Sequence, residues 1–133
     1  MDSATTLNRS ELHWAIDLAW LQANNISLST LAKGAVCAKC RKKLKMDHAE
    51  AKPSELLKSV KTCCSKSPGF ITGTLPIQES AFRVFLANGN EPLTLEELSS
   101  HLNQFRGTNA YQTSTGVLSR ILAHDEHYGL RQQ

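Results

Sequence analysis

Lysine and cysteine are absent from most of this 133-residue chain. All nine lysines and all four cysteines lie between residues 33 and 66. That stretch also contains Arg41 but only three acidic residues, so its net charge is +7, whereas residues 1–32 and 67–133 each carry −2. The formal net charge of +3 therefore conceals a basic, cysteine-containing middle between two mildly acidic flanks.

Several other absences restrict the class of protein. No apolar run approaches the roughly 20 residues needed to span a bilayer, and the N-terminus lacks the basic-then-apolar pattern of a signal peptide. We therefore expect a cytoplasmic protein, in which cysteines are thiols or metal ligands rather than disulfides. The chain contains neither a Gly-x-Ser-x-Gly motif nor a phosphate-binding Gly-x4-Gly-Lys motif. With no catalytic constellation, we expect a protein that is not an enzyme.

The N-terminal half predicts helices. Ser10 is placed to cap a helix that ends at Asn24 and Asn25, and Ser27 or Ser29 is placed to cap a short second helix. Pro53 suits the first turn of a third helix that runs to about residue 62 or 65. The apolar residues that give the first helix its periodicity are Leu12, Ile16, Ala19, Trp20 and Ala23.

The C-terminal half has a more specific pattern. Residues 77–87 predict a helix and residues 88–90 a turn, and Thr94 with Glu97 matches a capping box that opens the next helix. A loop, a further helix over residues 113–124 and a short final strand follow. The order helix, extended piece, helix, loop, helix, strand resembles the winged-helix variant of the helix-turn-helix, over about residues 77–131.

This resemblance implies that residues 113–124 occupy the place of a recognition helix, which winged-helix proteins often insert into the DNA major groove. The only basic residue on that segment is Arg120, and Asp125 and Glu126 close it. Affinity for nucleic acid comes largely from neutralising several phosphates, so one arginine is too few. The alternative is a winged unit used for packing or for contact with a protein.

The four cysteines suggest a metal site. Cys37 and Cys40 form a C-x2-C pair, which can bind one ion from a tight turn. Cys63 and Cys64 are the natural further ligands, with His48 as an alternative fourth ligand because adjacent cysteines usually point in different directions. We favour zinc as the cofactor. Buried thiols without metal and a redox pair are the alternatives.

The basic residues beside this pair suggest contact with a polyanion. In the functional interpretation, these basic residues contact phosphates and the metal site fixes their positions. In the alternative, they form a solvated surface. No Phe, Tyr or Trp lies between residues 33 and 66, so recognition of stacked single-stranded bases is not expected there. Duplex DNA or structured RNA fits better. The residues expected to meet phosphates are Lys39, Arg41, Lys42, Lys43, Lys45 and, on the winged unit, Arg120.

The sequence thus predicts a mainly α protein, in which a helical N-terminal half with a cysteine knuckle packs on a C-terminal winged-helix-like unit. The expected regions are residues 1–67, a linker at 68–76, and the winged-helix-like domain at 77–133. The expected function is non-enzymatic binding of DNA or structured RNA, as in a zinc-stabilised transcription- or translation-associated factor. The alternative is a protein-interaction adaptor with a winged-helix docking surface. No membrane contact is expected.

Overall fold

The computed structural model describes residues 12–46, 48–106 and 114–133. This part of the chain is mainly helical and contains seven α-helices, two 3-10 helices and a small sheet. In chain order the elements are β1 (His13–Ile16), α1 (Leu18–Ala23), α2 (Leu28–Ala32), η3 (Lys33–Ala35), α3 (Ala38–Lys43), α4 (Pro53–Thr62), η4 (Cys64–Lys66), α5 (Ile77–Ala87), β2 (Leu93–Thr94), α6 (Leu95–Arg106), α7 (Thr115–Ala123) and β3 (Leu130–Gln132).

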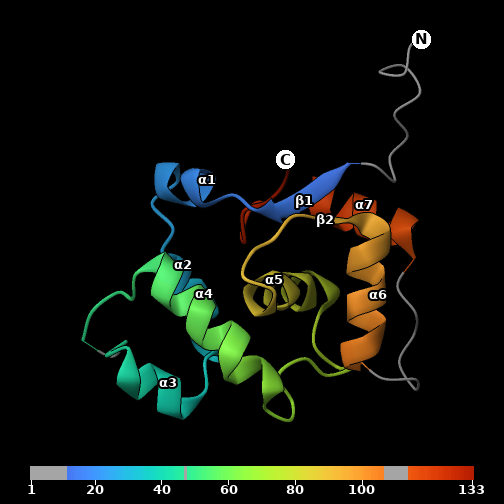
Figure 1. Cartoon of the computed structure of the whole chain (residues 1–133). Coiled ribbons are helices and arrows are strands. Elements are labelled where there is room, and N and C mark those ends of the chain that lie inside the picture. Colours follow the sequence, from blue (N-terminus) through green and yellow to red (C-terminus); the bar gives the residue numbers. More distant parts are fainter. Residues whose placement is uncertain (1–11, 47, 107–113) are drawn as a thin grey trace.

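Helix α5 is the centre of the core. Figure 1 shows α5 between α4 on one side and α6 on the other, with the small sheet lying beside it. Its contacts include α4, α6 and β1, and Phe82 and Phe85 are among the largest side chains that are fully buried. One core therefore extends from the cysteine-containing helices to the C-terminal elements.

The sheet joins the two ends of the chain. Its strand order is β2-β1-β3, and β1 pairs antiparallel with both neighbours. In the register, Trp14 lies opposite Leu93 on one side and opposite Gln132 on the other. The central strand of the sheet thus comes from the N-terminal segment, and both edge strands come from the last third of the chain.

The helix expected across residues 12–23 is wrong in its first part. Residues 13–16 form β1, and α1 begins only after Asp17, whose carboxylate accepts a hydrogen bond from the Trp20 N–H at 3.0 Å. The helical spacing of the apolar residues was misleading because β1 gains its hydrogen bonds from strands far away in sequence. The cap predicted at Ser10 lies outside the described residues.

Most other predicted helix ends are confirmed. Ser27 caps α2, with its hydroxyl accepting from the Thr30 N–H at 3.2 Å. Pro53 begins α4. Thr94 and Glu97 form the reciprocal capping box: the Thr94 N–H donates to the Glu97 carboxylate at 2.9 Å, and the Glu97 N–H donates to the Thr94 hydroxyl at 3.2 Å. The hydrogen bond from the Thr94 N–H also lowers the pKa of Glu97.

Candidate metal centre and basic surface

The four cysteines lie at the ends of two neighbouring helices. Cys37 is the N-cap of α3 and Cys40 lies in its first turn, whereas Cys63 is the C-cap of α4 and Cys64 begins η4. The backbone at Cys63 has φ −129° and ψ −64°, which ends the α-helix and redirects the chain. This break accounts for how two adjacent cysteines can both face Cys37.

The sulfur atoms of these cysteines lie close together. Cys37 Sγ is 3.8 Å from Cys63 Sγ and 3.4 Å from Cys64 Sγ. The sulfurs of Cys37, Cys40 and Cys63 all lie within 4.8 Å of one another. In a tetrahedral zinc site with zinc–sulfur bonds of about 2.3 Å, neighbouring sulfurs are about 3.8 Å apart. The Cys37–Cys63 distance matches this value, and the three cysteines Cys37, Cys40 and Cys63 could hold a metal ion; Cys64 is not in that group.

The environment of the thiols differs from one to the next. A backbone hydrogen bond from Cys40 lowers the pKa of Cys37 from 9.0 to about 7, against the opposing effect of burial. Burial is the main cause that raises the pKa values of Cys40 and Cys64. The Cys37 N–H donates to Cys64 Sγ at 3.3 Å, and such a donor stabilises a thiolate. Because the thiolate is the reactive and metal-binding form of cysteine, the lowered pKa makes Cys37 the most readily ionised of these three thiols near neutral pH.

His48 is not in this cluster. Its ring is exposed, on the turn that follows α3, and its backbone N–H donates to the Lys45 carbonyl at 3.1 Å. The group of metal-ligating side chains found among the described residues consists of cysteines alone. Cys64 is therefore better placed than His48 to complete the set, since its sulfur already contacts that of Cys37.

The basic residues predicted to meet phosphates share the helix of the C-x2-C pair. Lys39, Lys42 and Lys43 lie on α3 and are exposed, and Lys45 is exposed just beyond its end. Arg41 is half-buried, and its buried Nε has no hydrogen-bond partner among the described residues. The four lysines are therefore better presented to solvent than the arginine.

A groove separates the end of α3 from the exposed side of α4. Its volume is about 440 Å³. The charged residues that line it are Lys43, Lys45, Lys58 and Glu55, and the remainder are Leu44, Ser59 and Thr62. Sequence reasoning did not single out this groove, because it depends on how α3 and α4 lie against each other.

Arg120 does not join this basic surface. It is exposed on α7, which lies at the opposite end of the molecule from α3 (Figure 1). The carbonyl of Arg120 contacts His124 Nδ1 at 2.8 Å. Ser114 caps this helix by accepting from the Val117 N–H at 3.2 Å. Of the segment expected as a recognition helix, residue 113 lies outside the described residues.

Asp125 has a structural role that the sequence did not reveal. Its side chain is 1% exposed. The carboxylate accepts hydrogen bonds from the Gln78 amide and from the backbone N–H groups of His127, Tyr128 and Leu130. The signal available in the sequence was an acidic residue directly after the predicted helix over residues 113–124. The Asp125 carboxylate fixes the turn that leads into β3.

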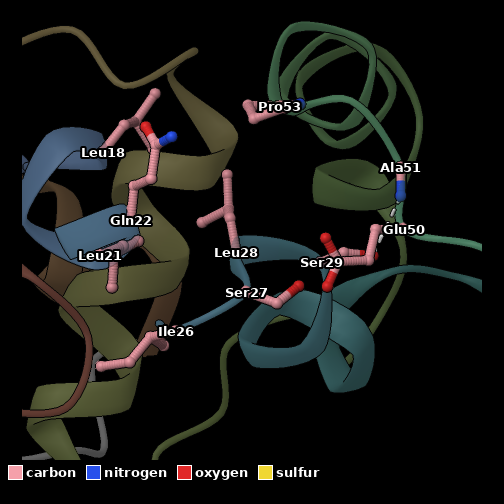
Figure 2. Close-up of a pocket in the computed structure, with 10 residues that line it drawn as sticks. All are labelled: Leu18, Leu21, Gln22, Ile26, Ser27, Leu28, Ser29, Glu50, Ala51 and Pro53. Carbon is pink, nitrogen blue, oxygen red and sulfur yellow. Dashed lines mark hydrogen bonds between the residues drawn. The ribbon is translucent and has the colours of Figure 1, made fainter. Parts of the chain in front are cut away.

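A second cleft, of about 310 Å³, lies between α1, α2 and the start of α4. Figure 2 shows Leu18 and Leu21 on one side and Ala51 with Pro53 on the other. The dashed line in Figure 2 is the hydrogen bond from the Ala51 N–H to the Ser29 hydroxyl, 3.3 Å long. This cleft is largely apolar and has no group of convergent charges.

The two tryptophans occupy different environments. Trp14 is in the core at 8% exposure. Trp20 is half-buried, and the guanidinium carbon of Arg131 lies 4.5 Å from the centre of its ring. Trp20 is therefore the more exposed of the two.

Comparisons of the chain with protein-family models, with curated proteins and with solved structures found no match. In the described parts of the chain, no helix combines the length and the apolar character needed to cross a membrane. Function must therefore be inferred from the chemistry of the side chains and from their positions.

Proposed function

We propose that this protein is a non-enzymatic, zinc-stabilised protein that binds duplex DNA or structured RNA through the basic surface of α3 and α4. The observation that carries the proposal is the convergence of the cysteine sulfurs from these two helices. A Zn²⁺ ion on Cys37, Cys40, Cys63 and Cys64 would tie the start of α3 to the end of α4. The exposed lysines of both helices would then be held as one surface.

Zinc fits the donor set better than other common ions do. Thiolates are soft ligands and favour zinc over the oxygen-seeking magnesium and calcium. Four thiolates around Zn²⁺ leave a net charge of −2, and the lysines nearby offset it. An isolated helix of six residues is too short to be stable in water, so α3 needs tertiary contacts, and a metal tether to α4 would add to them. The ion supplies structure, and no chemical step is assigned to it.

The C-terminal elements support a winged-helix-like unit as a second part of this proposal. The order α5, β2, α6, α7 and β3 follows the helix, strand, helix, helix, strand pattern of that fold. β1 would then stand in the sheet beside both β2 and β3, although it comes from the other end of the chain. With Arg120 as the basic residue on α7, we propose that this unit packs or docks and contributes little phosphate binding.

Fluorescence anisotropy of a labelled DNA duplex and a labelled RNA hairpin tests the proposal. The zinc-loaded chain should bind at low salt, with log K falling by about 0.9 for each phosphate contact per tenfold rise in salt. Changing Lys39, Lys42, Lys43 and Lys45 to Gln should abolish binding. Salt-insensitive binding, or binding that survives the four changes, would contradict the proposal and favour a protein-interaction adaptor.

A further inference from the structure

We propose that the groove between α3 and α4 is the seat of a backbone phosphate, with Lys43, Lys45 and Lys58 as its charged contacts. This inference rests on the proposed function and deepens it, because it names the chemical group that the basic surface holds and the place where it is held. The ligand is a phosphodiester of a nucleic-acid backbone.

The charges of the groove fit a single anion. Three lysines and one glutamate line it, which leaves a net charge of +2. All four are exposed, and within the described residues none of the three lysines forms a salt bridge. Glu55 on the same wall would repel an anion, so the net positive charge of the groove depends on the three lysines together.

The polar groups of the α4 wall add hydrogen-bonding capacity. Ser59 and Thr62 stand one turn apart on α4 and line the groove beside Lys58. The Thr62 hydroxyl donates to the Lys58 carbonyl at 2.8 Å, so its proton is not available to an anion. The Ser59 hydroxyl can donate to an anion. A phosphate in the groove would thus contact ammonium groups as well as a hydroxyl donor. Proteins commonly use this combination of groups to contact nucleic-acid phosphates.

The backbone at Lys45 is the independent observation. Lys45 has φ +56°, the left-handed conformation that glycine favours. It ends α3 in a Schellman arrangement, in which the Met46 N–H donates to the Arg41 carbonyl at 3.0 Å and the Lys45 N–H to the Lys42 carbonyl at 3.2 Å. Glycine is the usual residue at this position. A lysine in this conformation costs more free energy than a glycine would. Its side chain lines the groove.

Two triple variants with equal changes in charge test the seat in the full, zinc-loaded chain. The groove variant is Lys43→Gln, Lys45→Gln and Lys58→Gln. The control is Lys52→Gln, Lys61→Gln and Lys66→Gln, which removes three exposed lysines that do not line the groove. The groove variant should lose at least about tenfold more duplex affinity than the control, and its salt slope should fall by about 0.9, the value for one phosphate contact. Equal losses would overturn the seat while leaving the proposed function intact.

The Lys45→Gly variant separates loss of binding from loss of folding. Glycine suits the left-handed position, so the midpoint of thermal unfolding should rise, whereas duplex affinity should fall about two- to fivefold because one phosphate contact is lost. A variant that is more stable and binds more weakly cannot be explained by unfolding. Unchanged affinity would count against Lys45 as a contact and so against the seat.

Dimethyl phosphate, a small model of the backbone phosphodiester, tests the groove without any nucleic acid. Followed by two-dimensional NMR at constant ionic strength, it should shift the amide signals of Lys43, Lys45 and Ser59 and leave those of α7 unchanged. If no duplex or hairpin binds but these signals shift, the proposed function fails and the anion seat stands. If dimethyl phosphate shifts none of them, the seat is wrong.

Discussion

The side-chain amide of Asn90 bonds both backbone polar groups of Ile16, which lies 74 residues earlier in the chain. Asn90 Oδ1 accepts from the Ile16 N–H at 2.8 Å, and Asn90 Nδ2 donates to the Ile16 carbonyl at 2.9 Å. Asn90 has φ +62°, a conformation that asparagine tolerates better than most residues. One side chain thus extends the pairing of β1 beyond Leu93, its last partner on β2.

Asn90→Ala is therefore expected to destabilise the fold by about 2–3 kcal/mol. Two hydrogen bonds to partly buried backbone groups are lost, and alanine is strained at a positive φ. Urea unfolding at equilibrium measures the change. Asn88→Ala is the matched control, because Asn88 bonds only the nearby Glu91 at an exposed turn and should cost about 1 kcal/mol or less. If the two variants lowered the free energy of unfolding equally, the hydrogen bonds from Asn90 to β1 would contribute no more to stability than those of an exposed turn.

Asp125→Ala is expected to cost about 3–5 kcal/mol. The buried carboxylate accepts from three backbone N–H groups and from Gln78, and its removal leaves these donors unsatisfied. The neighbouring change Glu126→Ala, at an exposed residue, should stay within about 0.5 kcal/mol of the unchanged protein. Thermal and urea unfolding both report these differences. A cost below about 1 kcal/mol for Asp125→Ala would contradict the role assigned to this carboxylate.

The thiol of Cys37 should react first in the metal-free chain. Its pKa is lowered from 9.0 to about 7, so alkylation by iodoacetamide should rise through a midpoint near pH 7. Cys40 and Cys64, whose pKa values are raised, should remain slow above pH 9. Because the folded-state pKa of Cys37 is lowered, its contribution to stability is present above pH 9 and is lost as the pH falls through about 7.

Mass spectrometry of alkylated peptides makes this measurement. In urea all the cysteines should react alike, with a midpoint near 9, the ordinary value from which the pKa of Cys37 is lowered. Zinc should protect the folded chain at every pH where it stays bound. A midpoint near 9 for Cys37 in the folded, metal-free chain would show that the Cys40 N–H does not stabilise its thiolate.

The fourth zinc ligand is expected to be Cys64 rather than His48. Cys64→Ser should release zinc to a competing chelator at concentrations that leave the unchanged protein loaded, whereas His48→Ala should retain zinc as tightly as the unchanged protein. The zinc absorption edge should report four sulfurs at about 2.3 Å. Retention by the Cys64 variant together with loss from the His48 variant would reverse the assignment.

The parts of the fold that could be predicted are those with local causes. The ends of α2, α4, α6 and α7 follow from caps and from Pro53, all within a few residues of the helices that they delimit. β1 could not be predicted, because its pairing partners lie about 80 and 115 residues away and its apolar residues also match helical spacing. A strand whose stability comes from distant partners leaves no local pattern.

The same distinction applies to the candidate site. The C-x2-C pair and the neighbouring lysines were evident from residue types and spacing. Cys63 and Cys64 were also expected as further ligands, but the way in which both reach Cys37 depends on the backbone break at Cys63, which no residue type in that segment indicates. The groove is also a product of packing, since Lys43 and Lys58 lie on different helices.

The central claim is that zinc on the cysteines holds α3 against α4 so that their lysines can bind a nucleic-acid backbone. The most direct measurement is duplex affinity in one sample, first with zinc bound, then after chelation, and then after zinc is restored. We predict salt-dependent binding that is lost on chelation and recovered with zinc. Binding that is equally strong without zinc, or absent in all three states, would contradict the account.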